Sequence, residues 1–190
     1  RIVSPQIADA ICAPLSETIR EQIGKTERWL DEPGNTILTL ADSRYPGSLL
    51  EIPDPPLMLY VKGRVELLSK PSIAIVGSRN ATAQGCIDAE KFGCSLSDAG
   101  LTIISGLALG IDAAAHRGGL KGSGSTVAVI GTGADIIYPA RNRELAHQIA
   151  REGCIVSEFP LGTGPLASNF PRRNRVISGL SGGILVVEAA

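Results

Sequence analysis

The sequence of 190 residues lacks the features that mark membrane, secreted and metal-binding proteins. It has no run of about eighteen uncharged apolar residues, which excludes a membrane-spanning helix. No long apolar stretch follows Arg1, so no signal peptide is visible, and a start at Arg1 rather than Met predicts a fragment. The four cysteines, Cys12, Cys86, Cys94 and Cys154, form no C-x-x-C pair. This favours reduced thiols in a cytoplasmic protein over a zinc site or a disulfide framework.

Neither sign of charge is in clear excess, because 18 Lys and Arg oppose 19 Asp and Glu for a net charge of −1. Residues 1–60 carry five basic against nine acidic side chains, a net of −4, whereas residues 61–190 carry thirteen against ten, a net of +3. A mildly basic second part permits a phosphate-bearing partner without requiring one. Binding to nucleic acid would therefore depend on a local basic patch.

The common signatures of nucleotide-binding and hydrolytic enzymes are absent as well. No G-x-G-x-x-G follows an apolar run, since Gly131-Thr132-Gly133 has Ile136 where the third glycine would stand. There is no G-x-x-x-x-G-K-[ST] and no H-E-x-x-H. We see no complete catalytic constellation and expect a protein without enzymatic activity, metal or cofactor.

The sequence does contain a regular alternation of apolar runs and segments of helical length from residue 71 onward. The runs are SIAIVG (72–77), LTIISG (101–106), TVAVIG (126–131), CIVSE (154–158) and GILVVEA (183–189). The predicted helices cover 82–99, 108–121, 142–152 and 172–181. Strands that are apolar on both faces and alternate with helices are typical of a mostly parallel α/β sheet with helices on both faces.

The first part of the chain is organised differently. Residues 1–31 are predicted to be a helical segment, the remnant of an N-terminal helical domain, with one apolar stripe that Pro14 interrupts: Ile7, Ile11, Leu15, Ile19 and Ile23. Pro14 predicts two short helices or a kinked one. Residues 32–190 are predicted to be the main domain, with a turn-rich connector over 32–70 that contains short strands at 37–40 and 57–63.

The loops that follow the predicted strands are rich in glycine and hydroxyl groups. Gly77, Ser78 and Arg79 follow the first strand, and Ser105 and Gly106 end the second. Parallel sheets bind ligands beyond the carboxyl ends of their strands, where glycine permits close approach and helix N-termini present unpaired N–H groups. These loops predict a phosphate-binding surface. The alternative is that the glycines serve only tight turns between strands and helices.

Three of the four residues after Pro171 are arginines, and Pro171 itself favours the first turn of a helix. Cations are disfavoured at a helix N-terminus, so an anion is expected nearby. Two alternatives remain open: pairing with a carboxylate of Glu144, Glu158 or Glu188, or binding of a phosphate chain. The residues concerned are Arg172, Arg173, Asn174 and Arg175, and Arg141 and Arg143 repeat the pattern before the preceding helix.

Two further groups have both a structural and a functional interpretation. Asp112 and His116 are four residues apart on a predicted helix, and a structural Asp–His hydrogen bond is favoured over a general base. Phe159 and Phe170 lie near the same edge, where each is either a core residue or a platform for base stacking.

Several strings in order carry a family resemblance: IAIVGSRNATAQG, GLTIISGLALGIDAAAH, TVAVIGTGADIIYPARNREL and GCIVSEFPLGTGPLASNFPRRNRVISGLSGGILVVEA. Together with the connector DSRYPGSLLEIPDPPLMLYVKG they resemble the DNA-processing protein A family, DprA or Smf. The resemblance implies an extended Rossmann-like fold that binds single-stranded DNA and loads the RecA recombinase on it during natural transformation and recombination. It also implies a homodimer in the full-length protein and a cytoplasmic location.

The same resemblance assigns DNA-phosphate contacts to matching positions. They are Gly77, Ser78, Arg79, Ser105, Gly106, Arg172, Arg173, Asn174 and Arg175. Some relatives have a lysine after the Tyr-Pro pair, where this chain has Ala140, and Arg141 is the expected substitute. The family domain continues beyond Ala190 with further strands and helices, so we expect this chain to lack the end of the domain, where self-association and the RecA contact are expected.

Two other classes compete with the DNA-binding hypothesis. One is a nucleotide-binding or nucleoside-monophosphate-processing enzyme, because the layout resembles that of the cytokinin-activating phosphoribohydrolases. Their Pro-Gly-Gly-x-Gly-Thr signature is absent from this sequence, which argues against that enzyme class. The other is a structural or docking domain that binds neither DNA nor nucleotide.

Overall fold

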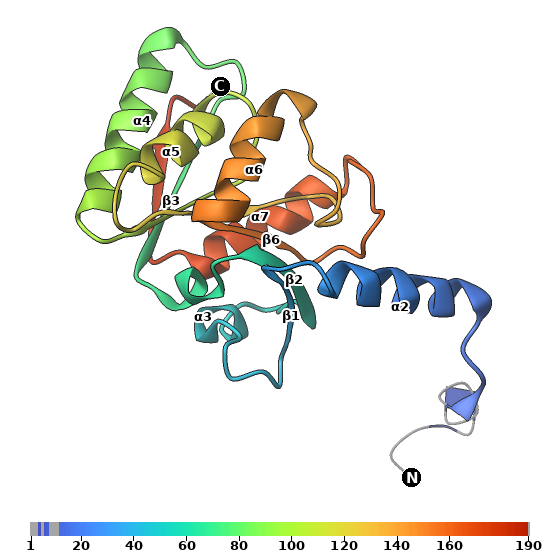
Figure 1. Cartoon of the computed structure of the whole chain (residues 1–190). Helices are drawn as coiled ribbons and strands as arrows, with labels where there is room; N and C mark the ends of the chain where they lie inside the picture. The colour runs from blue at the N-terminus through green and yellow to red at the C-terminus, as the bar shows by residue number, and fades with distance from the viewer. Residues whose placement is uncertain (1–3, 5, 8–11, 190) are drawn as a thin grey trace.

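The computed structural model describes residue 4, residues 6–7 and residues 12–189. These residues form a seven-stranded sheet in the order β1-β2-β6-β5-β4-β3-β7. Figure 1 labels β1, β2, β3 and β6 of this sheet. The strands are β1 (Asn35–Thr39), β2 (Met58–Gly63), β3 (Ser72–Gly77), β4 (Thr102–Ser105), β5 (Thr126–Val129), β6 (Cys154–Ser157) and β7 (Ile184–Val187). In the described part of the chain no helix is long and apolar enough to cross a membrane.

The strands from β3 to β7 are parallel, and their spatial order is β7-β3-β4-β5-β6. β1 and β2 extend this sheet beyond β6 by antiparallel pairing. The predicted mostly parallel sheet is therefore confirmed, and the two short strands of the connector form its antiparallel edge. This order brings the carboxyl ends of five strands to one edge, where ligands bind in such folds.

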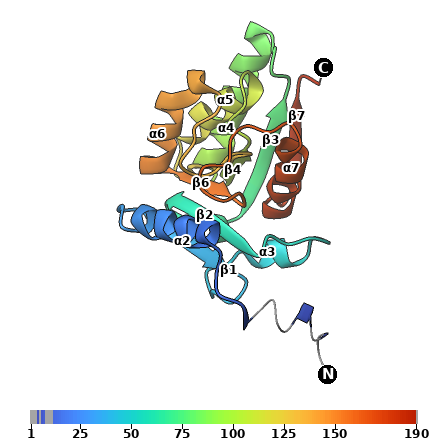
Figure 2. The same ribbon diagram turned by 90° about the vertical axis from the view of Figure 1, so that its right-hand side faces the viewer.

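Helices cover both faces of the sheet, as predicted (Figure 2). α4 (Ala83–Asp98), α5 (Ile111–Gly119) and α6 (Arg143–Glu152) cover one face. The other face carries α7 (Asn169–Leu180), the short helix α3 (Gly47–Leu50) and the 3-10 turn η1 (Val65–Ser69).

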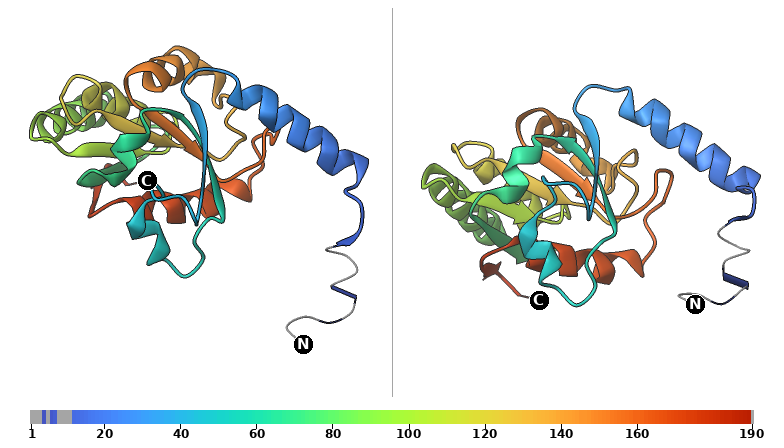
Figure 3. Two further views of the ribbon diagram at one scale, coloured as in Figure 1. Left: turned by 60° about the horizontal axis from the view of Figure 1, so that its bottom comes forward. Right: turned by 90° about the horizontal axis from the view of Figure 1, so that it is seen from below.

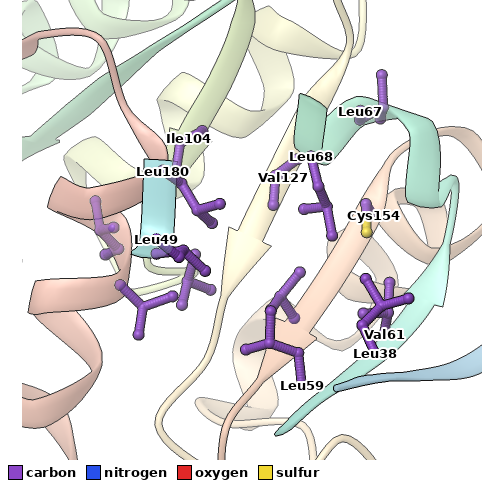
Figure 4. Close-up of a cluster of buried hydrophobic side chains, with 14 of the residues drawn as sticks. Leu38, Leu49, Leu59, Val61, Leu67, Leu68, Ile104, Val127, Cys154 and Leu180 are labelled. Carbon is purple, nitrogen blue, oxygen red and sulfur yellow. The ribbon is translucent and has the colours of Figure 1, made fainter. Parts of the chain in front are cut away.

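Successive strand residues point to opposite faces and fill separate cores. In β3, Ala74 packs under α7, whereas its neighbour Ile75 packs under α4 and α5. In β4, Ile104 and Ile103 divide in the same way. Figure 4 shows the core on the α7 side, where Leu180 and Leu49 lie beside the strand residues Ile104 and Val127. The continuous apolar runs of the sequence are thus explained by burial of both faces.

The helix α2 (Glu17–Leu30) projects away from the sheet (Figures 1 and 3). It begins after Ser16, whose side chain accepts a hydrogen bond from the Ile19 amide, so Pro14 precedes the helix instead of bending it. The predicted apolar stripe is solvent-exposed at Ile19 and Ile23, and Ile11 lies outside the described residues. The C-terminal half of α2 is attached to the domain that contains the sheet. Its contacts include the Lys25–Asp135 ion pair at 2.8 Å.

A buried histidine joins α5 to the strands beneath it. The Thr126 hydroxyl donates to the Ile103 carbonyl at 2.7 Å, and His116 Nδ1 lies 2.7 Å from the same hydroxyl oxygen. The proton between them therefore belongs to Nδ1, and Nε2 accepts from the Leu107 amide at 3.2 Å. The favoured Asp112–His116 hydrogen bond is absent from the described residues. Both side chains have the predicted structural role, but each binds the backbone of residues 106–108.

Burial of His116 predicts a stability that falls in mild acid. Burial, together with the charges of Arg173 and Arg117, lowers its pKa from 6.5 to about 3. The unfolded chain binds this proton more readily, so the contribution is complete above pH 6.5 and is lost as the pH falls toward 3. We expect a loss of about 2 kcal/mol in unfolding free energy between pH 7 and pH 5.

Urea titrations at pH 7 and pH 5 measure this loss, with His116→Gln to remove the titrating group. The exposed histidine of α6, changed in His147→Gln, serves as the matched control. The prediction fails if His116→Gln retains the pH dependence of the wild-type chain.

Candidate nucleic-acid interface

Two adjacent cavities lie at the carboxyl edge of the parallel strands. The first has a volume of about 260 Å³ and is lined by Val76, Gly77, Arg79, Ala108, Asp112, Arg173, Asn174, Ile177, Ser178 and Ile184. The second is smaller, about 80 Å³, and is lined by Arg79, Gly106, Ala108, Leu109, Tyr138, Pro139, Phe170 and Arg173. The sequence predicted a binding surface at this edge, and the two cavities share Arg79, Ala108 and Arg173.

Arg79 is the exposed cation between the two cavities. Its guanidinium lies 5.6 Å from the centroid of the Phe170 ring, and Phe170 in turn lies 5.9 Å from the ring of Tyr138. Within residues 12–189, Arg79 forms no ion pair. A guanidinium without a carboxylate partner, beside partly exposed aromatic rings, suits a ligand that carries both phosphates and bases.

The loop after β4 is held in an uncommon conformation by side chains that bind its backbone groups. Leu107 has a φ of 59°, a left-handed value that residues other than glycine rarely adopt. Asp112 Oδ2 accepts hydrogen bonds from the amides of Gly106 and Ala108 at 3.1 and 3.3 Å. The Asn142 amide group donates to the carbonyls of Leu107 and Ala108 at 2.9 and 3.1 Å. This loop is thus fixed before any ligand binds.

Arg173 extends from α7 beneath both cavities and is only 5% exposed. Its guanidinium donates to the carbonyls of Gly106 and Val129, which lie at the ends of β4 and β5. Burial lowers the pKa of Arg173, and the nearby Asp112 carboxylate partly offsets that effect. Burial raises the pKa of Asp112 in turn. Arg173 therefore supports the loops and adds positive charge below the cavities, while its N–H groups are largely occupied.

Arg175 is also occupied by internal partners. It forms short contacts with the Glu158 carboxylate and the Asp54 carbonyl, and its Nε lies 3.6 Å from the Asp54 carboxylate. Burial raises the pKa of Glu158, opposed by the charges of Arg175 and Arg172. Of the carboxylates considered from the sequence, Glu158 holds arginine here. Glu144 and Glu188 form no arginine ion pair among the described residues.

Arg172, by contrast, keeps a side chain that is 61% exposed. It lies over the Phe159 ring at 5.5 Å from the centroid, and its ion pair with Glu158 is long, at 3.8 Å. Phe159 itself is buried, whereas Phe170 is partly exposed. The exposed aromatic surface at this edge is therefore formed by Phe170 with Tyr138, whereas the buried Phe159 lies under the exposed Arg172.

The remaining predicted residues also divide into those with internal packing roles and those that are exposed. The buried Ser105 hydroxyl donates to the Ile75 carbonyl at 2.6 Å, whereas the Ser78 hydroxyl is partly exposed and accepts from the Asn80 amide at 3.1 Å. A side chain at Gly77 would clash with the Val187 carbonyl, so packing requires a glycine there, whereas one at Gly106 would force the Arg173 guanidinium to shift. Asn174 and Arg141 are exposed, Asn174 beside the first cavity and Arg141 in the 3-10 turn η2 (Ala140–Asn142).

Two residues at this edge were not among the predicted DNA-contacting residues. Tyr138 is 47% exposed and lies beside Phe170, with which it forms an exposed aromatic surface. Glu188 was considered as a partner for arginine, yet its carboxylate accepts hydrogen bonds from Thr82 at the start of α4. The sequence did contain a signal for the position of Glu188. Parallel strands end at the same edge of a sheet, so the carboxyl end of β7 lies at the same edge as that of β3.

Comparisons with known proteins agree with this architecture. The family model described as DNA recombination-mediator protein A matches residues 36–190. Protein Smf of Synechocystis is 49% identical over 80% of this chain, and Protein Smf of Escherichia coli is 44% identical over 90%. DNA processing protein DprA of Streptococcus pneumoniae is 45% identical over 80%. The chain spans 39%, 46% and 53% of these three relatives, respectively.

Solved structures show the same similarity. The X-ray structure of DNA processing protein A from Streptococcus pneumoniae aligns with all of this chain at a TM-score of 0.80 and 38% identity, over 68% of its own chain. The Helicobacter pylori protein, described for its unique single-stranded DNA binding mode, aligns with 80% at a TM-score of 0.72 and 31% identity, over 68% of its own chain. The chain therefore belongs to the DNA recombination-mediator protein A family.

Proposed function

We propose that this domain binds single-stranded DNA at the carboxyl edge of its sheet, chiefly through phosphates. The observation that carries the proposal is the placement of Arg79, an exposed cation without a carboxylate partner in the described chain, between two cavities and over the Phe170 ring. The structure of the Helicobacter pylori relative, described for single-stranded DNA binding, supports the same ligand.

The arginines at this edge have different tasks in the proposed complex. Arg79, Arg172 and Arg141 contact successive phosphates, because their guanidinium groups are exposed. Arg173 and Arg175 act indirectly, since their N–H groups hold carbonyl and carboxylate oxygens of the protein. Gly77, Ser78, Ser105, Gly106 and Asn174 shape the loops around these cations. Release of counterions from the phosphates supplies most of the affinity.

Preference for a single strand follows from the aromatic surface. Tyr138 and Phe170 present partly exposed rings beside Arg79, and unpaired bases stack on such rings, whereas a duplex hides its base faces. Phosphate contacts carry little sequence information, so we expect weak base specificity.

The wider role we propose is that of a mediator that helps to load RecA on single-stranded DNA in natural transformation and recombination. The family description, DNA recombination-mediator, and the motif resemblance support this role. The same resemblance supports a homodimer of the full-length protein, a cytoplasmic location, and binding without a catalytic step. A nucleoside-monophosphate enzyme is the competing function, because a cavity of about 260 Å³ beside Arg79 has room for one phosphate group.

A titration of labelled oligo-dT followed by fluorescence anisotropy tests the DNA proposal. We expect binding that weakens steeply between low and moderate salt and that is weaker for a duplex of equal length. Equal binding to the duplex contradicts the proposed role of the aromatic surface. Absence of binding at low salt, combined with stabilisation by a nucleoside monophosphate in a thermal-shift assay, supports the competing enzyme.

Replacing Arg79 should reduce affinity without loss of stability. We expect Arg79→Ala to weaken oligo-dT binding about tenfold and to reduce the slope of log K against log salt by about 0.7, the value for one phosphate contact on a single strand. Arg151→Ala, which removes an exposed arginine near the C-terminal end of α6, is the matched control. A collapse of thermal stability in Arg79→Ala would show that Arg79 is structural.

Replacing Arg173, in contrast to Arg79, should reduce the stability of the fold. Arg173→Met removes a buried cation that Asp112 and two carbonyls face, so we expect about 3 kcal/mol less unfolding free energy in urea. Arg172→Met, which changes the exposed neighbour, should stay within about 0.5 kcal/mol of the wild-type chain. If Arg173→Met keeps full stability but loses DNA binding, Arg173 contacts the DNA directly.

A further inference from the structure

Glu188, at the end of the edge strand β7, contacts the loop that carries Arg79. Glu188 follows β7, which pairs in parallel with β3, so it lies beside the end of β3. Its carboxylate accepts hydrogen bonds from the Thr82 amide at 2.9 and 3.1 Å and from the Thr82 hydroxyl at 2.8 Å. Thr82 is also the N-cap of α4 and accepts from the Gly85 amide at 3.0 Å. The carboxylate therefore sits at the N-terminus of α4.

The same residue also holds the other end of this loop. The Glu188 carbonyl accepts a hydrogen bond from the Ser78 amide at 2.9 Å. Ser78 and Thr82 are thus both bound to Glu188, by its main chain and its side chain respectively, and Arg79 lies between them. The Ser78 carbonyl is further held by the Ile111 amide at 3.2 Å. One residue, 106 positions away from Thr82, therefore fixes both ends of the 78–82 loop.

Two further features show that this arrangement is built into the fold. Glu188 has a φ of 55°, a conformation that costs free energy for a residue other than glycine and persists where surrounding contacts impose it. Gly85 leaves the space that the carboxylate fills, because a Cβ at this position would clash with Glu188 Oε2. Both the strand end and the first turn of α4 are thus shaped around this carboxylate.

Electrostatics separates a positioning role from a binding role. The N-terminus of α4 carries a partial positive charge, which an anion stabilises, and Glu188 supplies that anion internally. A carboxylate near the DNA repels phosphates, so simple removal of its charge should tighten DNA binding. A loss of binding on removal of the side chain would therefore have the opposite sign to the charge effect.

We propose that Glu188 is a positioning residue that fixes the 78–82 loop and thereby holds the Arg79 guanidinium between the two cavities. This inference rests on the proposed binding of single-stranded DNA. On this proposal Glu188, at the end of β7, affects DNA affinity only through Arg79. Glu188 itself does not contact the ligand.

Two substitutions of Glu188 test the proposal through oligo-dT affinity. Glu188→Ala should weaken binding several-fold, up to the roughly tenfold loss of Arg79→Ala. Glu188→Gln keeps an oxygen that accepts from the Thr82 amide, so it should bind as tightly as the wild-type chain or more tightly. In the Arg79→Ala background, Glu188→Ala should cause no further loss, because the effect acts through Arg79. Wild-type affinity in a folded Glu188→Ala variant overturns the proposal.

A third variant displaces the carboxylate while retaining its charge. Gly85→Ala places a methyl group where Glu188 Oε2 lies, and alanine favours the helix, so the variant is expected to fold. It should weaken binding in the same way as Glu188→Ala, and the double variant should lose no more than either single one. Wild-type affinity in Gly85→Ala counts against the proposal even if Glu188→Ala fails to fold.

Hydrogen exchange separates this proposal from the proposed function. The Thr82 amide should exchange faster in Glu188→Ala and Gly85→Ala than in the wild-type chain, and at the wild-type rate in Glu188→Gln. If the wild-type chain binds no single-stranded DNA, the proposed function fails whatever the exchange rates are. If it binds DNA and the Thr82 exchange rate is the same in all variants, the positioning role fails alone.

Discussion

The buried guanidinium of Arg173 is the interaction on which the candidate site depends most. It comes from α7 on one face of the sheet and donates to carbonyls at the ends of β4 and β5. Strand ends leave carbonyl groups unpaired, and burial of such groups without a donor is costly. Arg173 satisfies two of them at once, and its guanidinium lies against Gly106, where an added Cβ would force it to shift. The loop after β4, and with it both cavities, takes its shape from this contact.

Around that contact the protein arranges its own anions before any external anion arrives. Asp112 binds the amides of the β4 loop, Glu158 holds Arg175, and Glu188 occupies the N-terminus of α4. Each of these carboxylates satisfies a positive group that a phosphate could otherwise have taken. The arginines that remain available to a ligand are exposed at the surface around the cavities. The positive charge available to a ligand is therefore smaller than the number of arginines in the motifs implies.

The architecture could be predicted from the sequence. The sequence did not predict which arginines are exposed and which bind oxygen atoms of the protein itself. Continuous apolar runs such as SIAIVG identify buried parallel strands, and parallel order forces their carboxyl ends to one edge. Local sequence does not reveal which arginine meets which partner, because Arg175 reaches Asp54 across 121 residues and Thr82 reaches Glu188 across 106. Such pairings depend on tertiary packing. For the same reason the i,i+4 spacing of Asp112 and His116 indicated one helix face but not their separate backbone partners.

The small number of exposed arginines proposed to contact the DNA constrains how the proposed complex works. Arg79, Arg141 and Arg172 are exposed, and three phosphate contacts on a single strand correspond to a salt slope of about −2. A slope that small implies modest affinity for one domain at physiological salt. Two such sites joined in one assembly raise the apparent affinity without any new contact, since the second site then binds the same strand at high effective concentration. The proposed homodimer of the full-length protein would therefore add affinity by geometry, and the rigid Arg79 loop would keep both sites ready to bind.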